Sequence, residues 1–348
     1  MGLVSVAKRV ILGSSKRLGL TVRVLNSGWR KQRLLIVCWH KIAVHDEHVW
    51  NPALCVSAAL FWSRLKILQE LKCSVLPLGD ALEMLWHNQL PPRSVALTFD
   101  DGDSSFFLQA WPMLREFGFP ATLYWTTYYS TRSLSVFDPM LSYLLWKGRD
   151  RELVLGEPRA RFNLRSIDGR ANAFRELYRC SVDNAWSSLK KEAFLEELAL
   201  TLEVDYRDIR GKRILQLITA EEANEMVAQG LDLELHTHRH RVPRDRERFV
   251  GELDENAQYI VGVGAPQPRH FCYPSGSVAP EFGRWLELNG VKSATTCQPG
   301  IAELKSAPYM LPRYLDKQTV TDGEFVSWLS GVSALLCRGQ EMDLHGFG

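Results

Sequence analysis

From residue 34 to residue 330 the chain alternates short apolar segments with longer segments whose apolar residues recur at helical spacing. The first apolar segment, 34–40, is continuous, which is typical of a strand buried on both faces. Further strands are predicted at 73–78, 94–101, 121–125, 231–240, 269–273, 291–296 and 311–316. Helices are predicted at 57–71, 80–86, 104–117, 219–230, 280–288 and 324–329. This alternation predicts an α/β fold with a mainly parallel sheet, either a barrel or a doubly wound sheet.

The regular alternation stops between residues 127 and 215. Phe137, Met140, Leu141 and Leu144 have helical spacing, and residues 186–202 form a second helix candidate. We interpret 127–215 as a largely helical insertion that covers or borders the functional site. Its aromatic residues fit a hydrophobic core better than a platform for sugars.

Composition and charge exclude several classes of protein. The 348 residues are 46% hydrophobic and 24% charged, as in ordinary globular proteins. The 42 basic and 40 acidic residues nearly cancel, and no zinc-finger or RNA-recognition pattern occurs, so nucleic acid is not expected as a partner. Seven cysteines without a Cys-x-x-Cys pair indicate free thiols in a reducing compartment.

The amino-terminal segment is strongly basic, because eight Lys and Arg residues lie within residues 1–33 and the first acidic residue is Asp46. We treat residues 1–33 as a basic amphipathic leader, 34–330 as the main domain and 331–348 as a tail. The leader either makes peripheral contact with an anionic membrane or packs loosely as a solvated segment. No secretory signal or membrane-spanning stretch is predicted, so we expect a cytoplasmic protein or one peripheral at the cytoplasmic membrane face.

Residues 98–102, Thr-Phe-Asp-Asp-Gly, end the strand predicted at 94–101. Asp100 and Asp101 therefore lie at the carboxyl end of a strand, where ligands gather in parallel α/β folds. Adjacent carboxylates repel each other unless a cation or a shared proton offsets the repulsion. The pair indicates a metal site or an acid/base site, and the alternative is an ordinary turn.

Three histidines follow another strand end. In residues 231–240, Asp232, Glu234 and His236 share one face of the strand by alternation. His236 and His240 are four residues apart, which lets two imidazoles converge on one ion in a helix or tight turn, whereas His238 between them points elsewhere. The alternative is a solvated basic loop.

A third segment, residues 269–276, ends in a Pro-x-Gly turn that either presents backbone N–H groups to an oxyanion or only reverses the chain. The order Thr-Phe-Asp-Asp-Gly, His-Thr-x-x-His and aromatic strand with Pro-x-Gly resembles the polysaccharide deacetylase family of the NodB-homology, carbohydrate esterase type. The resemblance covers roughly residues 34–330. It implies a distorted (β/α) barrel of about seven units, fewer than the eight of a regular barrel.

Members of that family use a divalent metal to remove acetyl groups from N-acetylated amino sugars, or sometimes O-acetyl groups. The resemblance implies that Asp101, His236 and His240 bind the metal, for which Zn²⁺ is suited and Co²⁺, Ni²⁺ or Fe²⁺ also fit. It implies that Asp100 is the general base for a metal-bound water. A backbone N–H near Ser275 would help to hold the oxyanion.

Supporting residues are less clearly defined. Asp232 or Glu234 is a candidate to orient His236. In many family members an arginine that orients the base stands where this chain has Cys272, and an aromatic residue stands at Ser275. Arg269 is a candidate source of the missing charge, in a different register.

The general acid is not defined by the sequence. The family's late Leu-His motif matches only Leu344-His345, beyond the last barrel helix, which argues against His345 as the acid. His40, His238 and a metal-bound water are the candidates.

The first functional hypothesis is a metal-dependent deacetylase of N-acetylated saccharides in surface polysaccharide biosynthesis. The alternatives are a small-molecule amide hydrolase on the same fold and a carbohydrate-binding relative with weak catalysis.

Overall fold

The computed structural model of the chain describes residues 19, 21, 23–131, 134–156 and 160–337. Most of the predicted leader and the end of the predicted tail, with Leu344-His345, lie outside these residues. In the described part, no helix combines the length and the apolar character needed to cross a membrane.

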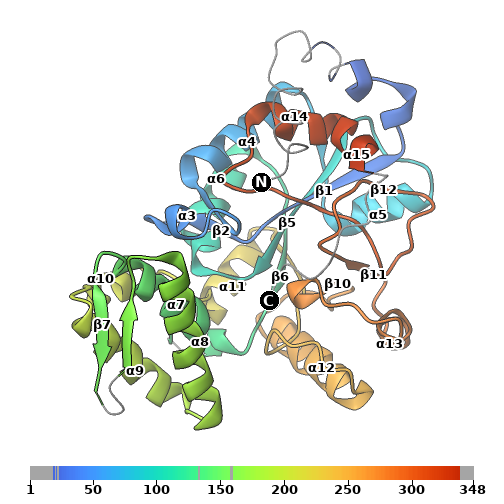
Figure 1. Ribbon diagram of the computed structural model, residues 1–348. Helices are drawn as coiled ribbons and strands as arrows, with labels where there is room; N and C mark the ends of the chain where they lie inside the picture. The colour runs from blue at the N-terminus through green and yellow to red at the C-terminus, as the bar shows by residue number, and fades with distance from the viewer. Residues whose placement is uncertain (1–18, 20, 22, 132–133, 157–159, 338–348) are drawn as a thin grey trace.

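A curled parallel sheet forms the centre of the molecule (Figure 1). Its strands, in spatial order, are β11 (Ser293–Thr295), β10 (His270–Cys272), β9 (Asp232–Leu235), β6 (Thr122–Trp125), β5 (Ser94–Asp101) and β1 (Arg33–Trp39). Three short strands lie beside this path: β13 (Tyr314–Leu315) and β12 (Ala302–Glu303) pair with β1, and β4 (Ser74–Val75) pairs with β5.

The segment that contains β13 closes the sheet into a barrel. Leu311 bridges Thr295 in parallel, and Tyr314 pairs in parallel with Val37. The segment therefore connects β11 to β1, and the ring has the parallel order predicted from the strand and helix alternation. The expected distorted (β/α) barrel is confirmed.

The two faces of the barrel strands form separate cores. Outward residues such as Val37, Leu97 and Leu123 belong to the larger core with the surrounding helices. Inward residues such as Ile36 and Ala96 cluster with Leu78, Leu82 and other apolar residues of α5 (Leu78–Trp86). Since α5 belongs to this inner core, the polar residues of the lumen are placed toward the carboxyl ends of the strands.

Most of the helices around the barrel were predicted. The predicted helices around the barrel that the structure confirms are α4 (Ala58–Glu70), α6 (Trp111–Phe117), α11 (Ala220–Ala228), α13 (Phe282–Leu288) and α14 (Asp322–Ser330), and the barrel also carries α12 (Arg246–Gly262) and α15 (Val332–Cys337). Ser57 caps α4, and Thr219 with Glu222 forms a capping box on α11. Sequence patterning missed α12 and α15. It also missed a small parallel sheet of β2 (Lys41–Ala43) and β3 (Cys55–Ser57), with the short helix α3 (Glu47–Trp50) between them.

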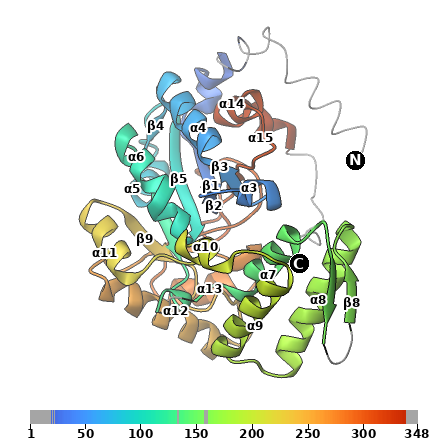
Figure 2. The ribbon, with the colours of Figure 1, turned by 90° about the vertical axis from the view of Figure 1, so that its left-hand side faces the viewer.

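The insertion is a separate lobe with its own core (Figure 2). It contains α7 (Phe137–Lys147), the antiparallel hairpin β7 (Glu152–Leu155) and β8 (Ala160–Asn163), α8 (Ile167–Asp183), α9 (Ser188–Thr201) and α10 (Tyr206–Gly211). Phe137 and Tyr143 are buried in this core, as expected for aromatic residues of helical spacing. Asp46, next to α3, accepts hydrogen bonds from Tyr143 and, at 2.8 Å, from Lys147, and so joins the lobe to the barrel.

A buried ion-pair network anchors the segment that follows β13. Arg64 on α4 is fully buried, and its Nε donates to Asp316 Oδ2 at 2.9 Å. Its Nη2 donates to the carbonyl of Val320 at 2.6 Å, and Trp39 Nε1 donates to the same Asp316 oxygen at 3.2 Å. Arg64 therefore connects α4 to the segment that completes the barrel.

We predict that Arg64→Met lowers the free energy of unfolding by roughly 3–5 kcal/mol, because it leaves Asp316 as a buried charge without its cation. Urea unfolding monitored by circular dichroism measures the change. Arg284→Met, which removes an exposed ion pair with Glu287, is the control and should cost less than about 1 kcal/mol. Equal effects of the two substitutions would show that the buried network does not stabilise the barrel.

Candidate active site

The turn after β5 separates its two carboxylates. Asp100 points into the barrel and is 2% exposed, whereas Asp101 adopts a positive φ of 74° with a side chain that is 26% exposed. Gly102 has φ 84°, and a Cβ there would lie 2.3 Å from Cδ1 of Trp125. Only glycine fits against the Trp125 ring in this conformation. The turn therefore directs Asp100 inward and Asp101 to the mouth.

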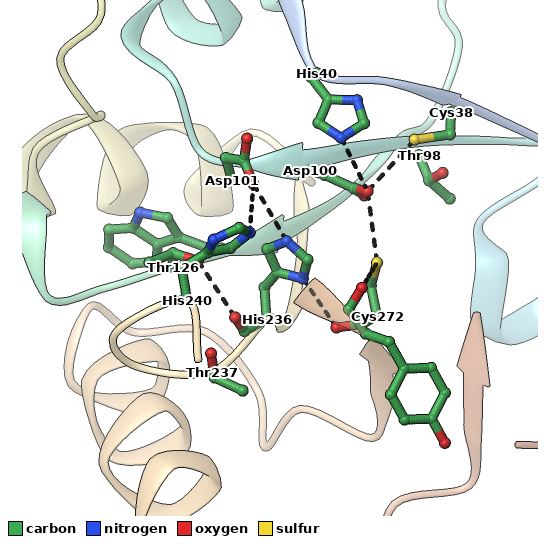
Figure 3. Close-up of polar contacts among 12 residues, drawn as sticks. Cys38, His40, Thr98, Asp100, Asp101, Thr126, His236, Thr237, His240 and Cys272 are labelled. Carbon is green, nitrogen blue, oxygen red and sulfur yellow. Dashed lines mark hydrogen bonds and ion pairs between the residues drawn. The ribbon is translucent and has the colours of Figure 1, made fainter. Parts of the chain in front are cut away.

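Asp101, His236 and His240 come together at the mouth of the barrel (Figure 3). Nε2 of His236 lies 3.2 Å from Asp101 Oδ1, and Nε2 of His240 lies 3.3 Å from the same oxygen. Positive φ angles at Thr237 (62°) and His240 (54°) form the tight turn that the four-residue spacing predicted. Two imidazoles and one carboxylate, with donor atoms within 4.8 Å of one another, suit Zn²⁺ or a similar divalent metal.

Hydrogen bonds from other elements hold His236 in position. Its Nδ1 lies 2.9 Å from the carbonyl oxygen of Cys272, and its backbone N–H donates to Asn256 Oδ1 at 2.9 Å. Asn256 on α12 is fully buried and also donates to the carbonyl of Trp125. Such partners fix the ring orientation of a metal ligand. Asn256 was missed, because nothing in the sequence linked α12 to the site.

The two acidic candidates for orienting His236 have other partners. Glu234 accepts the backbone N–H groups of Arg269 and His270, both at 2.7 Å, and Asp232 accepts from Thr122 at 2.8 Å. They share a strand face with His236 but lie nearer the amino end of the barrel. Glu234 therefore connects β9 to β10 and does not orient His236.

Arg313 makes a two-pronged ion pair with Asp100. Nη1 and Nη2 of Arg313 each lie 2.7 Å from one carboxylate oxygen, and both side chains are 2% exposed. Burial alone would raise the pKa of Asp100, but the charge and hydrogen bonds of Arg313 outweigh burial and hold that pKa well below its usual range. Asp100 is therefore a fully ionised carboxylate in a buried site.

Two thiols complete the surroundings of Asp100. Sγ of Cys38 and Sγ of Cys272 each lie 3.5 Å from Asp100 Oδ2, and Arg313 Nη2 lies 3.0 Å from Cys272 Sγ. His40, Cys38 and Asp100 satisfy the distance criterion for a metal site, as do Asp100, His236 and Cys272. Arg313 already binds both oxygens of Asp100 and repels a cation there. The group with Asp101 is thus the better candidate to hold a metal ion.

Arg313, and not the candidate Arg269, supplies the positive charge beside Asp100. Arg269 is exposed and precedes β10, at the amino end of the barrel, whereas Asp100 lies at the carboxyl end. Arg313 follows Leu311 by two residues on the closing segment, so it faces the lumen with Leu311. The sequence signal that could have placed Arg313 in the lumen was this alternation within Leu-Pro-Arg-Tyr.

Of the histidine candidates for the acid, His40 lies beside the base. Its Nε2 is 3.7 Å from Asp100 Oδ2, and its Nδ1 is buried without a hydrogen-bond partner. Burial lowers the pKa of His40, so its ring is neutral near pH 7. His238 instead contacts Thr127 at 2.8 Å and lies 3.4 Å from Glu255 on α12, away from Asp100.

Ser275 lies in the predicted Pro-x-Gly turn, a short helical turn over Pro274–Gly276. Its side chain is exposed, and its φ is 54°. The neighbouring N–H groups of Tyr273 and Gly276 donate to the carbonyls of Thr295 and Tyr273. The N–H of Ser277 donates to the carbonyl of Pro274 in the same way. Those three groups are not available to an oxyanion, so any backbone donor from this turn is that of Ser275.

Comparison with known proteins agrees with this geometry. The sequence model of the polysaccharide deacetylase family matches residues 87–145 and 195–294. The chain therefore contains a polysaccharide deacetylase domain, with the insertion interrupting the match, and it is a deacetylase hydrolase of that family. No curated protein sequence matched the chain.

Solved structures of similar fold are deacetylases with low sequence identity. The deacetylase PplD of Streptococcus pyogenes, solved with acetate, has a TM-score of 0.57 at 16% identity, covering 85% of this chain and 97% of PplD. IcaB of Ammonifex degensii has a TM-score of 0.53 at 17% identity, with 86% and 97% covered. A de-N-acetylase of Aggregatibacter actinomycetemcomitans has a TM-score of 0.52 at 14% identity, with 84% and 98% covered. At these identities the likeness is one of fold.

We predict that His240→Ala and Asp101→Asn each weaken the binding of one Zn²⁺ more than about 100-fold, since loss of an outer partner alone costs about 10- to 100-fold. Titration calorimetry on metal-stripped protein measures the affinity. His238→Ala is the matched control and should bind Zn²⁺ like the unmodified chain. Retention of one tightly bound ion by His240→Ala would rule out this ligand set.

Proposed function

We propose that the protein is a metal-dependent hydrolase that removes acetyl groups from the N-acetylated amino sugars of a poly- or oligosaccharide. The observation that carries the proposal is that a possible metal donor set and a buried carboxylate lie next to each other at the end of β5. A His-His-Asp donor set lies at the barrel mouth, and Asp100, which immediately precedes the Asp101 of that set, is a buried carboxylate held ionised by Arg313.

Asp101, His236 and His240 would hold the metal, Zn²⁺ or else Co²⁺, Ni²⁺ or Fe²⁺. When bound, a metal of this kind lowers the pKa of water and polarises a carbonyl oxygen as a Lewis acid. The side-chain exposure of Asp101 and His240, at 26% and 36%, leaves the donor set open to a substrate from the solvent side.

Asp100 accepts the proton of the attacking water on a carboxylate oxygen. Arg313 fixes the orientation of that carboxylate through both of its oxygens, and burial excludes competing water. A base with so low a resting pKa passes its proton on readily. His40 is neutral at rest and lies 3.7 Å away, so its Nε2 takes the proton and donates it to the departing amine.

An N-acetylated saccharide is the substrate that best fits the family and the described groups. The retained base and acid argue against a carbohydrate-binding role alone, which would need neither. Hydrolysis of a small non-sugar amide uses the same groups and is the alternative outcome of the substrate test.

We further propose a role in surface polysaccharide biosynthesis, at the cytoplasmic face of the membrane.

The proposal is tested by acetate release from N-acetylglucosamine oligomers, using metal-stripped protein with Zn²⁺, Co²⁺ or Ni²⁺ added back. Restored release would support the proposal. Tight metal binding with acetate release from small amides but from no sugar would favour the alternative.

We predict that Asp100→Asn lowers kcat by about 100- to 10,000-fold, the usual contribution of a general base, while Zn²⁺ binding persists.

Arg313→Met should also lower kcat, and it should move the acidic limb of the pH–rate profile to higher pH. The sign follows from burial, which raises the pKa of Asp100 once the cation is gone. Arg269→Met is the control with neither effect. An unshifted acidic limb in Arg313→Met would exclude Asp100 as the group that titrates there.

We predict that His40→Gln reduces acetate release from an N-acetyl sugar about 100-fold or more, because the amine cannot leave without a proton. Hydrolysis of 4-nitrophenyl acetate should fall far less, since nitrophenolate leaves without protonation. The ratio of the two rates is the measurement. Equal losses on both substrates would show that His40 is not the acid, and His238→Ala should preserve both rates.

A further inference from the structure

A basic cavity lies at the other end of the barrel from the carboxylates of β5. It has a volume of about 430 Å³, within the range of small-ligand sites. Arg30, Lys31, Lys72 and Arg93 line it together with small polar residues such as Ser27 and Ser74, and no carboxylate lines it. We call it the basic cavity.

Among the described residues, the acceptors of the hydrogen bonds from the two arginines of the basic cavity are neutral. Arg30 is 1% exposed, and it donates to the backbone carbonyls of Leu329 and Ser94, each at 2.9 Å, and to that of Arg33. Arg93 donates to Asn26 Oδ1 and to the carbonyl of Leu71. Burial lowers the pKa of Arg30 to about 10, which reflects a cation without a nearby negative charge.

The cations of the basic cavity differ in their partners from two other buried cations of the chain. Arg64 and Arg313 each bind a buried carboxylate. Within the residues that the structure describes, no ion pair joins Arg30, Lys31, Lys72 or Arg93 to an acidic side chain. Four cations without a counter-charge around one cavity create a positive potential that attracts an anion with several oxygens.

The basic cavity is too far from the catalytic groups to serve the reacting sugar. Arg93 immediately precedes β5, and Asp101 ends that strand. Eight residues of strand at about 3.3 Å each place the cavity roughly 25 Å from the metal donors. The segment with Arg30 and Lys31 also lies on the opposite side of the molecule from the insertion in Figures 1 and 2.

From this arrangement we propose that the basic cavity binds a phosphate group, supplied by the headgroups of an anionic phospholipid surface. Guanidinium and ammonium groups recognise phosphate oxygens directly. In the sequence, five Lys and Arg residues between positions 8 and 23 come shortly before Leu25, the first residue that lines the cavity, so they would add their charge to that of the cavity at an anionic surface. The active site would then open away from the lipid, toward a saccharide.

The test compares the full-length chain with the double variant Lys31→Glu/Lys72→Glu in sedimentation with phosphatidylglycerol vesicles and with phosphatidylcholine vesicles. Both lysines belong to the cavity lining, and the basic amino-terminal residues are unchanged. We expect the unmodified chain to bind phosphatidylglycerol and the variant to bind at least about 30-fold more weakly, the effect of two lost cations. Arg175→Glu/Lys190→Glu in the insertion carries the same charge change and should bind like the unmodified chain.

Titration with inorganic phosphate separates the two sources of the same chemistry. Binding of inorganic phosphate that the double variant loses, without vesicle binding, would assign the cavity to a soluble phosphate and overturn the lipid surface as its partner. Equal vesicle and phosphate binding by the chain and the double variant would overturn the phosphate site itself. Acetate release from a soluble oligomer should be unchanged in this variant, so failure of the cavity proposal and failure of the deacetylase proposal are distinguishable.

Discussion

The ion pair between Asp100 and Arg313 links β5 to the segment that closes the barrel. Arg313 lies between Leu311, which bridges β11, and Tyr314, which pairs with β1. The guanidinium therefore reaches Asp100 only when the ring of parallel strands is complete. Because both groups are buried, separating them would leave an uncompensated charge in an apolar core. Closure of the fold and ionisation of Asp100, the proposed base, thus depend on the same contact.

The neighbouring groups follow from that pair. Cys272 is small enough to leave room for Arg313 above β10, and its carbonyl holds His236 while its thiol approaches Asp100. One residue thus contacts both the proposed base and a proposed metal ligand. The Gly102 turn against Trp125 then sends Asp101 out of the lumen to meet the imidazoles. Chemistry that needs two carboxylates in different environments is obtained from adjacent residues.

The two ends of the barrel have different electrostatic character. At the carboxyl ends of the strands, nearly every charge has a partner, and the open group is the donor set of Asp101. At the amino end, residues of α5 pack in the inner core, and four cations line a cavity without a carboxylate. The proposed saccharide and the proposed anionic surface would therefore contact the molecule at different sites.

The sequence by itself determined the alternating fold, the carboxylate pair and the histidine spacing. These are local properties: strand periodicity, a glycine turn, and a four-residue interval that brings two rings together. Tertiary structure alone decided which distant groups complete the site. Arg313 is more than two hundred positions from Asp100, Asn256 acts from a helix that patterning missed, and Arg269 lies at the wrong end of its strand. His40 rather than His238 adjoins the base because strand ends converge, a consequence of barrel closure that no local pattern encodes.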